Sequence, residues 1–169
     1  MRRAATLVAM ILATWPACRR EVGEKPVLAE PTSVEALPAT LLRPDGRPKV
    51  LMLYAVACPR SRRLFDSWLE LAARHHPRVA FHSVSIDTTQ ARAASLAGAH
   101  PVEFDNHWLP PETATRLGEA LRPLGFSLGP FWSLPTVAVL DRQGRLVEAR
   151  EGTDSAGWIQ DAIALAERR

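Results

Sequence analysis

An unbroken apolar run, KVLMLYAV from Lys49 to Val56, most constrains how this chain can fold. A strand with one face in water alternates apolar and polar residues, whereas this run has no charged position after its first residue. It therefore predicts a strand that is buried on both faces, as in sheets that carry helices on both sides. Cys58 lies two residues after this run, and from Ser61 to His75 apolar residues recur at helical spacing. The sequence thus places a cysteine at a strand-to-helix junction.

The rest of the chain continues this alternation of strands and helices. A hairpin near the C-terminus and a closing helix capped by Asp154 or Ser155 end the pattern. The order predicts an α/β fold with a mixed sheet between helices. The expected elements are a strand over 79–87, a helix from 88 to about 98, an extended piece over 101–105, a helix from 110 that stops at Gly125, a strand over 134–141, its hairpin partner over 146–152 and a helix over 154–169.

The N-terminus has the pattern of an export signal. Arg2 and Arg3 precede about ten apolar residues, which are too few to span a bilayer, and Cys18 follows the small residue Ala17. Residues 1–17 are therefore interpreted as a signal peptide. Cys18 resembles the lipidated cysteine of bacterial lipoproteins, which predicts a protein anchored on the periplasmic side of a bacterial membrane. Trp15 departs from that pattern, so soluble export and an uncleaved anchor stay open as alternatives.

Composition and cysteine content narrow the function further. Residues 18–38 are rich in Pro, Glu and Ala without a clean period, and are expected to form a tether. If Cys18 is lipidated, Cys58 is the only free thiol and no intramolecular disulfide can form. The net charge of +3, without basic patches interleaved with aromatic residues, gives no basis for nucleic-acid binding.

Three segments carry a resemblance to a known family. LYAVACPRSR, from Leu53 to Arg62, resembles the F-W-A-x-W-C-x-x-C-R segment of the TlpA-like and ResA-like thiol-disulfide proteins of the bacterial envelope. VSID, from Val84 to Asp87, resembles their second-strand motif. SLPTVAVLDRQGRLV, from Ser133 to Val147, resembles G-x-P-T-x-x-x-I-D-x-x-G-x-x-V and is the most specific of the three. The resemblance covers roughly residues 39–167.

This resemblance implies a thioredoxin-like domain over residues 39–169, with a TlpA-like insertion between about 91 and 132. It makes Cys58 the nucleophile, at a helix start where backbone N–H groups and the helix dipole favour a thiolate. Pro135 resembles the cis-proline that faces the cysteine in this family. Its neighbour Leu134 would offer a backbone edge to a bound substrate.

The chain also departs from the family pattern. Ser61 stands where the family has its resolving cysteine, and a hydroxyl can donate a hydrogen bond to a thiolate but cannot attack a mixed disulfide. Met52 and Leu64 occupy positions where the family has polar or acidic residues, and Ala57 replaces a Trp. The expected chemistry is therefore monothiol exchange with the thiols or disulfides of exported proteins, in which an external thiol reductant releases each adduct.

Structural interpretations of the same residues stay open beside the chemical ones. Cys58 can be a small buried apolar residue, Ser61 an ordinary residue of a first helical turn, and Pro135 an ordinary turn proline. Arg60, Arg62 and Arg63 can form a solvated helix face. The five histidines show no ligand spacing, so the sequence predicts no cofactor and no metal. The alternative function is a redox-inactive binding module or assembly factor for an exported client.

Overall fold

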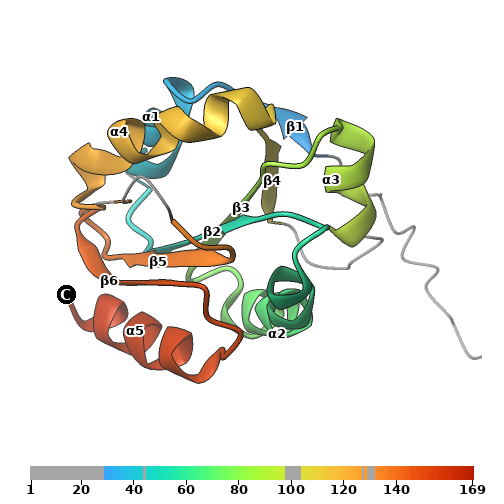
Figure 1. The fold of residues 1–169 in the computed structure, drawn as a ribbon. Coiled ribbons are helices and arrows are strands. Elements are labelled where there is room, and N and C mark those ends of the chain that lie inside the picture. The colour runs from blue at the N-terminus through green and yellow to red at the C-terminus, as the bar shows by residue number, and fades with distance from the viewer. Residues whose placement is uncertain (1–28, 44, 98–103, 127, 129–131) are drawn as a thin grey trace, which may run out of the picture.

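A mixed sheet of six strands organises the computed structural model, which describes residues 29–43, 45–97, 104–126, 128 and 132–169 (Figure 1). The strand order is β1-β4-β3-β2-β5-β6. The first four strands in this order run parallel, whereas β5 pairs antiparallel with β2, and β6 with β5. The predicted α/β architecture with a mixed sheet between helices is confirmed. The strands are β1 (Glu30–Pro31), β2 (Lys49–Tyr54), β3 (Ala80–Ser85), β4 (Asp105–Trp108), β5 (Thr136–Leu140) and β6 (Leu146–Glu151).

Strand β2 lies inside the sheet and is buried along its whole length, as its apolar run predicts. Side chains alternate across a strand, so Val50 and Met52 enter one core while Leu51 and Leu53 enter the other. The first core packs against α2 (Pro59–His75) and α5 (Gly157–Arg168). The second packs against α1 (Ala36–Leu42) and α4 (Leu117–Leu121), on the opposite face (Figure 1).

Helix α2 directly follows the strand-to-helix junction. Pro59 occupies its first turn, where a missing N–H breaks no intrahelical hydrogen bond and the fixed φ suits a helix. Leu64, Phe65 and Trp68 are fully buried on one side of the helix. This apolar stripe fixes the rotation of α2 against the sheet, and with it the position of the residues at the helix start.

The folded part of the chain extends further toward the N-terminus than the expected boundary at residue 39. Strand β1 and the start of helix α1 fall within the segment expected to be a tether, and Ala29, Val34 and Leu37 are buried there. These apolar residues are separated by prolines and glutamates, so no helical or strand period marks them in the sequence. The expected signal peptide (1–17) and Cys18 lie outside the described residues.

Three local expectations differ, wholly or in part, from the structure. The extended piece expected over 101–105 falls mostly outside the described residues, and the strand described here runs from Asp105 to Trp108. Helix α5 begins at Gly157 with Ala156 as its N-cap and no side-chain cap, because Asp154 pairs with Arg63. The helix expected from residue 110 is a series of short turns that ends at Gly125 in a left-handed conformation (φ 76°). These turns are a 3-10 helix (Pro111–Arg116), α4 and a second 3-10 helix (Arg122–Leu124), and α3 (Gln90–Ala97) precedes β4.

None of the helices in the described part of the chain has the length and hydropathy needed to cross a bilayer.

Candidate functional site

Cys58 is the N-cap residue of α2, and a short loop of residues 55–57 connects it to the end of β2. Its backbone is extended (φ −80°, ψ 117°), and its side chain is partly exposed. The thiol donates a hydrogen bond to the carbonyl oxygen of Leu134, at 3.5 Å. A thiol in this position has one face on protein backbone and the other open to solvent. It is therefore accessible to a reaction partner without being free to rotate away.

The residues that face Cys58 belong to the turn that enters β5. The Leu134–Pro135 peptide bond is cis, and Pro135 is buried while Leu134 is partly buried. The N–H of Gly152, just after β6, contacts the carbonyl oxygens of Pro135 at 2.8 Å and of Ser133 at 3.3 Å. Gly152 has φ +63°, and a Cβ added there would lie 3.2 Å from Nη1 of Arg60. Glycine is therefore required for the close approach of these segments.

The surroundings of the sulfur favour its ionised form. Burial raises the pKa of Cys58, but hydrogen bonds from the Ser61 hydroxyl and from the backbone N–H groups of Ser61 and Arg60 lower it. The positive charge of Arg60 acts in the same direction. The net effect is a thiol whose pKa lies below its ordinary value. This is the electropositive, partly exposed setting typical of reactive cysteines.

The three arginines of the expected cluster have different surroundings. Arg60 donates a hydrogen bond to the carbonyl of Gly152 at 3.3 Å and lies close enough to affect the thiol. Arg63 forms an exposed ion pair with Asp154 at 2.9 Å. Arg62 is exposed on α2. The cluster is thus partly a site feature and partly a solvated helix face.

An open groove of about 570 Å³ lies beside the thiol. Cys58 and Leu134 line it together with the indole of Trp132 and the cationic side chains of Arg60 and Arg63. The lining combines apolar surface, positive charge and exposed backbone. A peptide segment with apolar or acidic side chains would fit such a surface.

Ser61 lies beneath the thiol and is fully buried. Its hydroxyl accepts a long hydrogen bond (3.5 Å) from the N–H of Ala55, and its closeness to the sulfur lowers the pKa of Cys58. Met52 and Leu64 are fully buried in the apolar core under the site. The main groups that lower the pKa of Cys58 are thus the Ser61 hydroxyl, two backbone N–H groups and the Arg60 charge.

Asp87 supports the segment that leads to the thiol, a role that the sequence did not indicate beyond its place in the VSID motif. Its carboxylate is buried and accepts hydrogen bonds from the N–H of Val56 at 2.8 Å and from the Ser85 hydroxyl at 2.7 Å. The Arg92 guanidinium lies 3.5 Å from its other oxygen. Its backbone carbonyl accepts from the indole of Trp108 at 2.7 Å. Asp87 therefore joins β3, β4 and the Cys58 loop.

No family model matches the chain, and no curated protein matches it. Solved structures do resemble it. A thioredoxin-family thiol:disulfide interchange protein from Chlorobium tepidum matches with a TM-score of 0.61 and 16% identity, over 85% of this chain and 97% of the other. A DsbF homologue from Corynebacterium diphtheriae matches with a TM-score of 0.56 and 21% identity, over 74% and 75% of the two chains.

A secreted Mycobacterium tuberculosis disulfide oxidoreductase, homologous to E. coli DsbE, also matches, with a TM-score of 0.56 and 16% identity over 75% of this chain and 85% of the other. Similarities at this level of identity concern the arrangement of the backbone and not the chemistry of the site. Together with the mixed sheet and its flanking helices, they show that the chain has a thioredoxin-like fold, as its sequence predicts.

Proposed function

We propose that the protein carries out thiol-disulfide exchange through Cys58 as a single nucleophile. The observation that carries the proposal is the setting of the sulfur, which lies beside the Leu134 carbonyl and receives hydrogen bonds and positive charge that lower its pKa. The solved structures of the same fold are described as thiol:disulfide interchange proteins and a disulfide oxidoreductase, which agrees with this chemistry.

The exchange takes two balanced steps. The Cys58 thiolate attacks one sulfur of a partner's disulfide, so that a bond forms between Cys58 and that sulfur while the other partner sulfur leaves as a thiolate. An external thiol reductant then attacks the mixed disulfide and releases Cys58. Ser61 takes no covalent part, because an alcohol does not displace a thiolate from a disulfide. Because Ser61 lowers the pKa of Cys58, it would stabilise the Cys58 thiolate both when that thiolate attacks and when it leaves.

The groove supplies the binding surface for the partner. Leu134 would pair its backbone with an extended segment of an exported protein, and Pro135 would hold that backbone facing the thiol. Trp132 would contact apolar side chains of the partner. The expected partners are exported protein thiols or disulfides, with no nucleic acid and no cofactor involved.

Reaction with a small disulfide tests the proposal directly. The protein is mixed with oxidised glutathione, and the adduct on Cys58 and the released thiol are measured by mass spectrometry and by thiol titration. We expect one adduct per chain on Cys58, faster formation than in urea-unfolded protein, and full reversal by dithiothreitol. A Cys58→Ser variant controls for other sites. Formation no faster than in the unfolded chain would overturn the proposal.

A redox-inactive binding module is the second candidate function. The apolar side chains of Met52 and Leu64, which lie in the core where the resemblance implies polar helpers, favour it. In that case the groove would hold a client without covalent chemistry. The glutathione experiment separates the two functions, because a binding module has no reason to accelerate the reaction of Cys58.

Export and anchoring belong to the same proposal. Residues 1–17 would direct export, Cys18 would carry the lipid, and the following residues would connect it to the folded domain on the periplasmic side of a membrane. Expression in a bacterial host with a Cys18→Ala control tests this. The mature wild-type chain should gain the mass of a lipid on Cys18 and fractionate with membranes, and the variant should do neither.

A further inference from the structure

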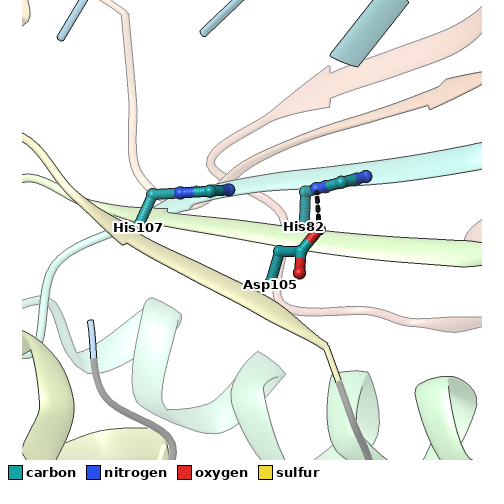
Figure 2. A group of neighbouring side chains, drawn as sticks. All are labelled: His82, Asp105 and His107. Carbon is teal, nitrogen blue, oxygen red and sulfur yellow. Dashed lines mark ion pairs between the residues drawn. The ribbon is translucent and has the colours of Figure 1, made fainter. Parts of the chain in front are cut away.

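Three potential metal ligands lie together on one face of the sheet, away from the thiol. His82 belongs to β3, and Asp105 and His107 belong to β4 (Figure 2). Their ligating atoms all lie within 4.8 Å of one another. The register explains the grouping, because His82 pairs with Asp105 and side chains two residues apart on β4 share a face.

The two imidazoles lack the hydrogen bonds that buried rings normally make. The ring of His82 is 5% exposed, and neither of its nitrogens has a hydrogen-bond partner. Its Nδ1 lies 3.1 Å from a carboxylate oxygen of Asp105, which is an ion-pair contact without the alignment of a hydrogen bond. Nε2 of His107 is also without a partner. Buried nitrogens left in this way are unusual in folded proteins, and a metal ion that accepts a lone pair would account for one nitrogen of each ring.

We propose that His82, Asp105 and His107 bind a divalent transition-metal ion, with Zn²⁺ as the best match. Two imidazoles and a carboxylate suit Zn²⁺ and its neighbours, whereas Mg²⁺ and Ca²⁺ take oxygen ligands. Three protein ligands leave a fourth position for water, as in open zinc sites. The Asp105 side chain is 64% exposed, so it can move the short distance needed to bring all three ligands to one ion.

The geometry of the pair of rings fits a shared ion. Their planes lie within 10° of parallel, with centroids 6.2 Å apart (Figure 2). Ligand atoms around a tetrahedral zinc ion are about 3.3 Å apart for bonds of about 2.0–2.1 Å. The ligating atoms, which lie within 4.8 Å of one another, must therefore approach by up to about 1.5 Å, and we expect rotation about the side-chain bonds to supply this approach.

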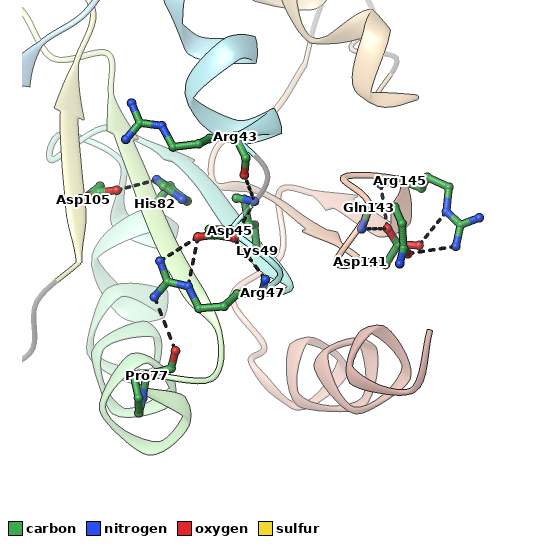
Figure 3. A network of polar contacts seen from close by, with 10 residues as sticks. All are labelled: Arg43, Asp45, Arg47, Lys49, Pro77, His82, Asp105, Asp141, Gln143 and Arg145. Carbon is green, nitrogen blue, oxygen red and sulfur yellow. Dashed lines mark hydrogen bonds and ion pairs between the residues drawn. The ribbon is translucent and has the colours of Figure 1, made fainter.

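The surrounding charges suit a cation. Glu30 on β1 pairs with His107 and places a second carboxylate on this edge of the sheet. The nearby cation that acts on Asp105 is Arg47, but its guanidinium is held by the Asp45 carboxylate at 2.7 and 3.0 Å and contacts the Pro77 carbonyl (Figure 3). These contacts hold the Arg47 guanidinium against the Asp45 carboxylate and the Pro77 carbonyl.

The cluster is separate from the proposed redox site, because His82 pairs with Leu51, which lies three residues, or about 10 Å, before the end of β2. The inference therefore does not depend on the proposed function.

Titration of the full-length chain with Zn²⁺ alone tests the site, after both cysteines have been alkylated so that thiols cannot bind the ion. We expect one Zn²⁺ per chain by native mass spectrometry and calorimetry. Asp105→Asn and His107→Gln should each weaken binding at least about tenfold, since even the loss of a group behind a ligand has that effect. Asp66→Asn and His76→Gln, which change exposed residues on or just after α2, should bind as the wild type does.

Two further readouts distinguish a specific metal site from nonspecific binding. Co²⁺ should give the visible absorption bands of a tetrahedral complex in the wild type and not in Asp105→Asn. Zn²⁺ should raise the melting temperature of the wild type more than that of either ligand variant. The absence of saturable binding, or equal binding by wild type, Asp105→Asn and His107→Gln, would overturn the proposal. So would a loss of binding in the His76→Gln control.

Discussion

The thiol of Cys58 donates a hydrogen bond to the carbonyl oxygen of Leu134 at 3.5 Å, although the two residues are 76 positions apart in the chain. They meet because β2 and β5 are neighbours in the sheet, so the start of α2 faces the turn that enters β5. A thiolate has no proton to donate. In the proposed exchange, ionisation of Cys58 would therefore free the Leu134 carbonyl to accept a hydrogen bond from a partner's backbone.

The charge of Arg60 is expected to set part of the reactivity of Cys58. Arg60→Gln removes a positive charge that stabilises the thiolate, so the pKa of Cys58 rises and alkylation at pH 7 slows, by about two- to fivefold for one partly solvated charge. Arg62→Gln is the matched control, because Arg62 is exposed on the same turn and is not one of the main causes of the lowered thiol pKa. Equal rates in the two variants would contradict this role for Arg60.

Ser61→Cys should convert the site into a dithiol. Ser61 is fully buried beside Cys58, at the position where the resemblance implies a resolving cysteine. We expect the variant to gain insulin-reducing activity with dithiothreitol, measured by turbidity, while wild type and Ser61→Ala show little. If the variant gains nothing, the apolar surroundings of Met52 and Leu64 do not support dithiol turnover.

Asp87→Asn should loosen the loop before Cys58. The carboxylate accepts hydrogen bonds from Val56 and Ser85, and hydrogen bonds to a buried charged group contribute about 1.5–3 kcal/mol each. Because an amide oxygen keeps part of this bonding, we expect a loss of about 1–3 kcal/mol in the free energy of unfolding, measured with urea. The exposed Asp161→Asn on α5 should leave stability almost unchanged. A stable Asp87→Asn protein would show that the loop is held by other contacts.

Stability should fall between about pH 4 and pH 2 partly because of Asp45. Burial raises the pKa of Asp45, but hydrogen bonds from Arg47 and the ion pair with Lys49 lower it to about 2, against 3.8 for an ordinary aspartate (Figure 3). The native state thus takes up its proton later than the unfolded chain does. Its stabilising contribution is complete above the unfolded-state pKa and is lost as the pH falls toward 2.

Urea unfolding at several pH values measures this contribution. Asp45→Asn should be less stable than wild type at pH 7 and should lose less stability as the pH falls below about 4. Asp66→Asn, on the surface of α2, serves as the control. Parallel pH profiles for wild type and Asp45→Asn would show that other carboxylates account for the acid sensitivity.

The sequence predicted the fold well where a single segment carries a strong pattern of its own. The run from Lys49 to Val56 predicted a central buried strand, and β2 is that strand. The segment around Pro135 carried a family pattern specific enough to predict the facing turn. Strand β1 and helix α1 were not predicted, because their few apolar residues become meaningful only once they pack against β4 and α4.

The features of the two sites that the sequence did not predict depend on how strands that are distant in the sequence pair in the sheet. Asp87 contacts Val56 only because β3 ends level with β2. His82 and His107 show no ligand spacing along the chain, yet the pairing of β3 with β4 brings them to one face with Asp105. The one local signal is the Asp-x-His pattern of β4, which places two ligand types on the same face of a strand.

The most direct test of the central claim is the pH dependence of Cys58 alkylation by iodoacetamide, measured by peptide mass spectrometry so that Cys58 is distinguished from Cys18. Folded and urea-unfolded protein are compared across about pH 5 to pH 10, a range that spans the ordinary thiol pKa of about 8.5. An activated thiol predicts a lower midpoint in the folded protein and faster labelling at pH 7. A folded-state midpoint equal to or above that of the unfolded chain, with slower labelling, would contradict it.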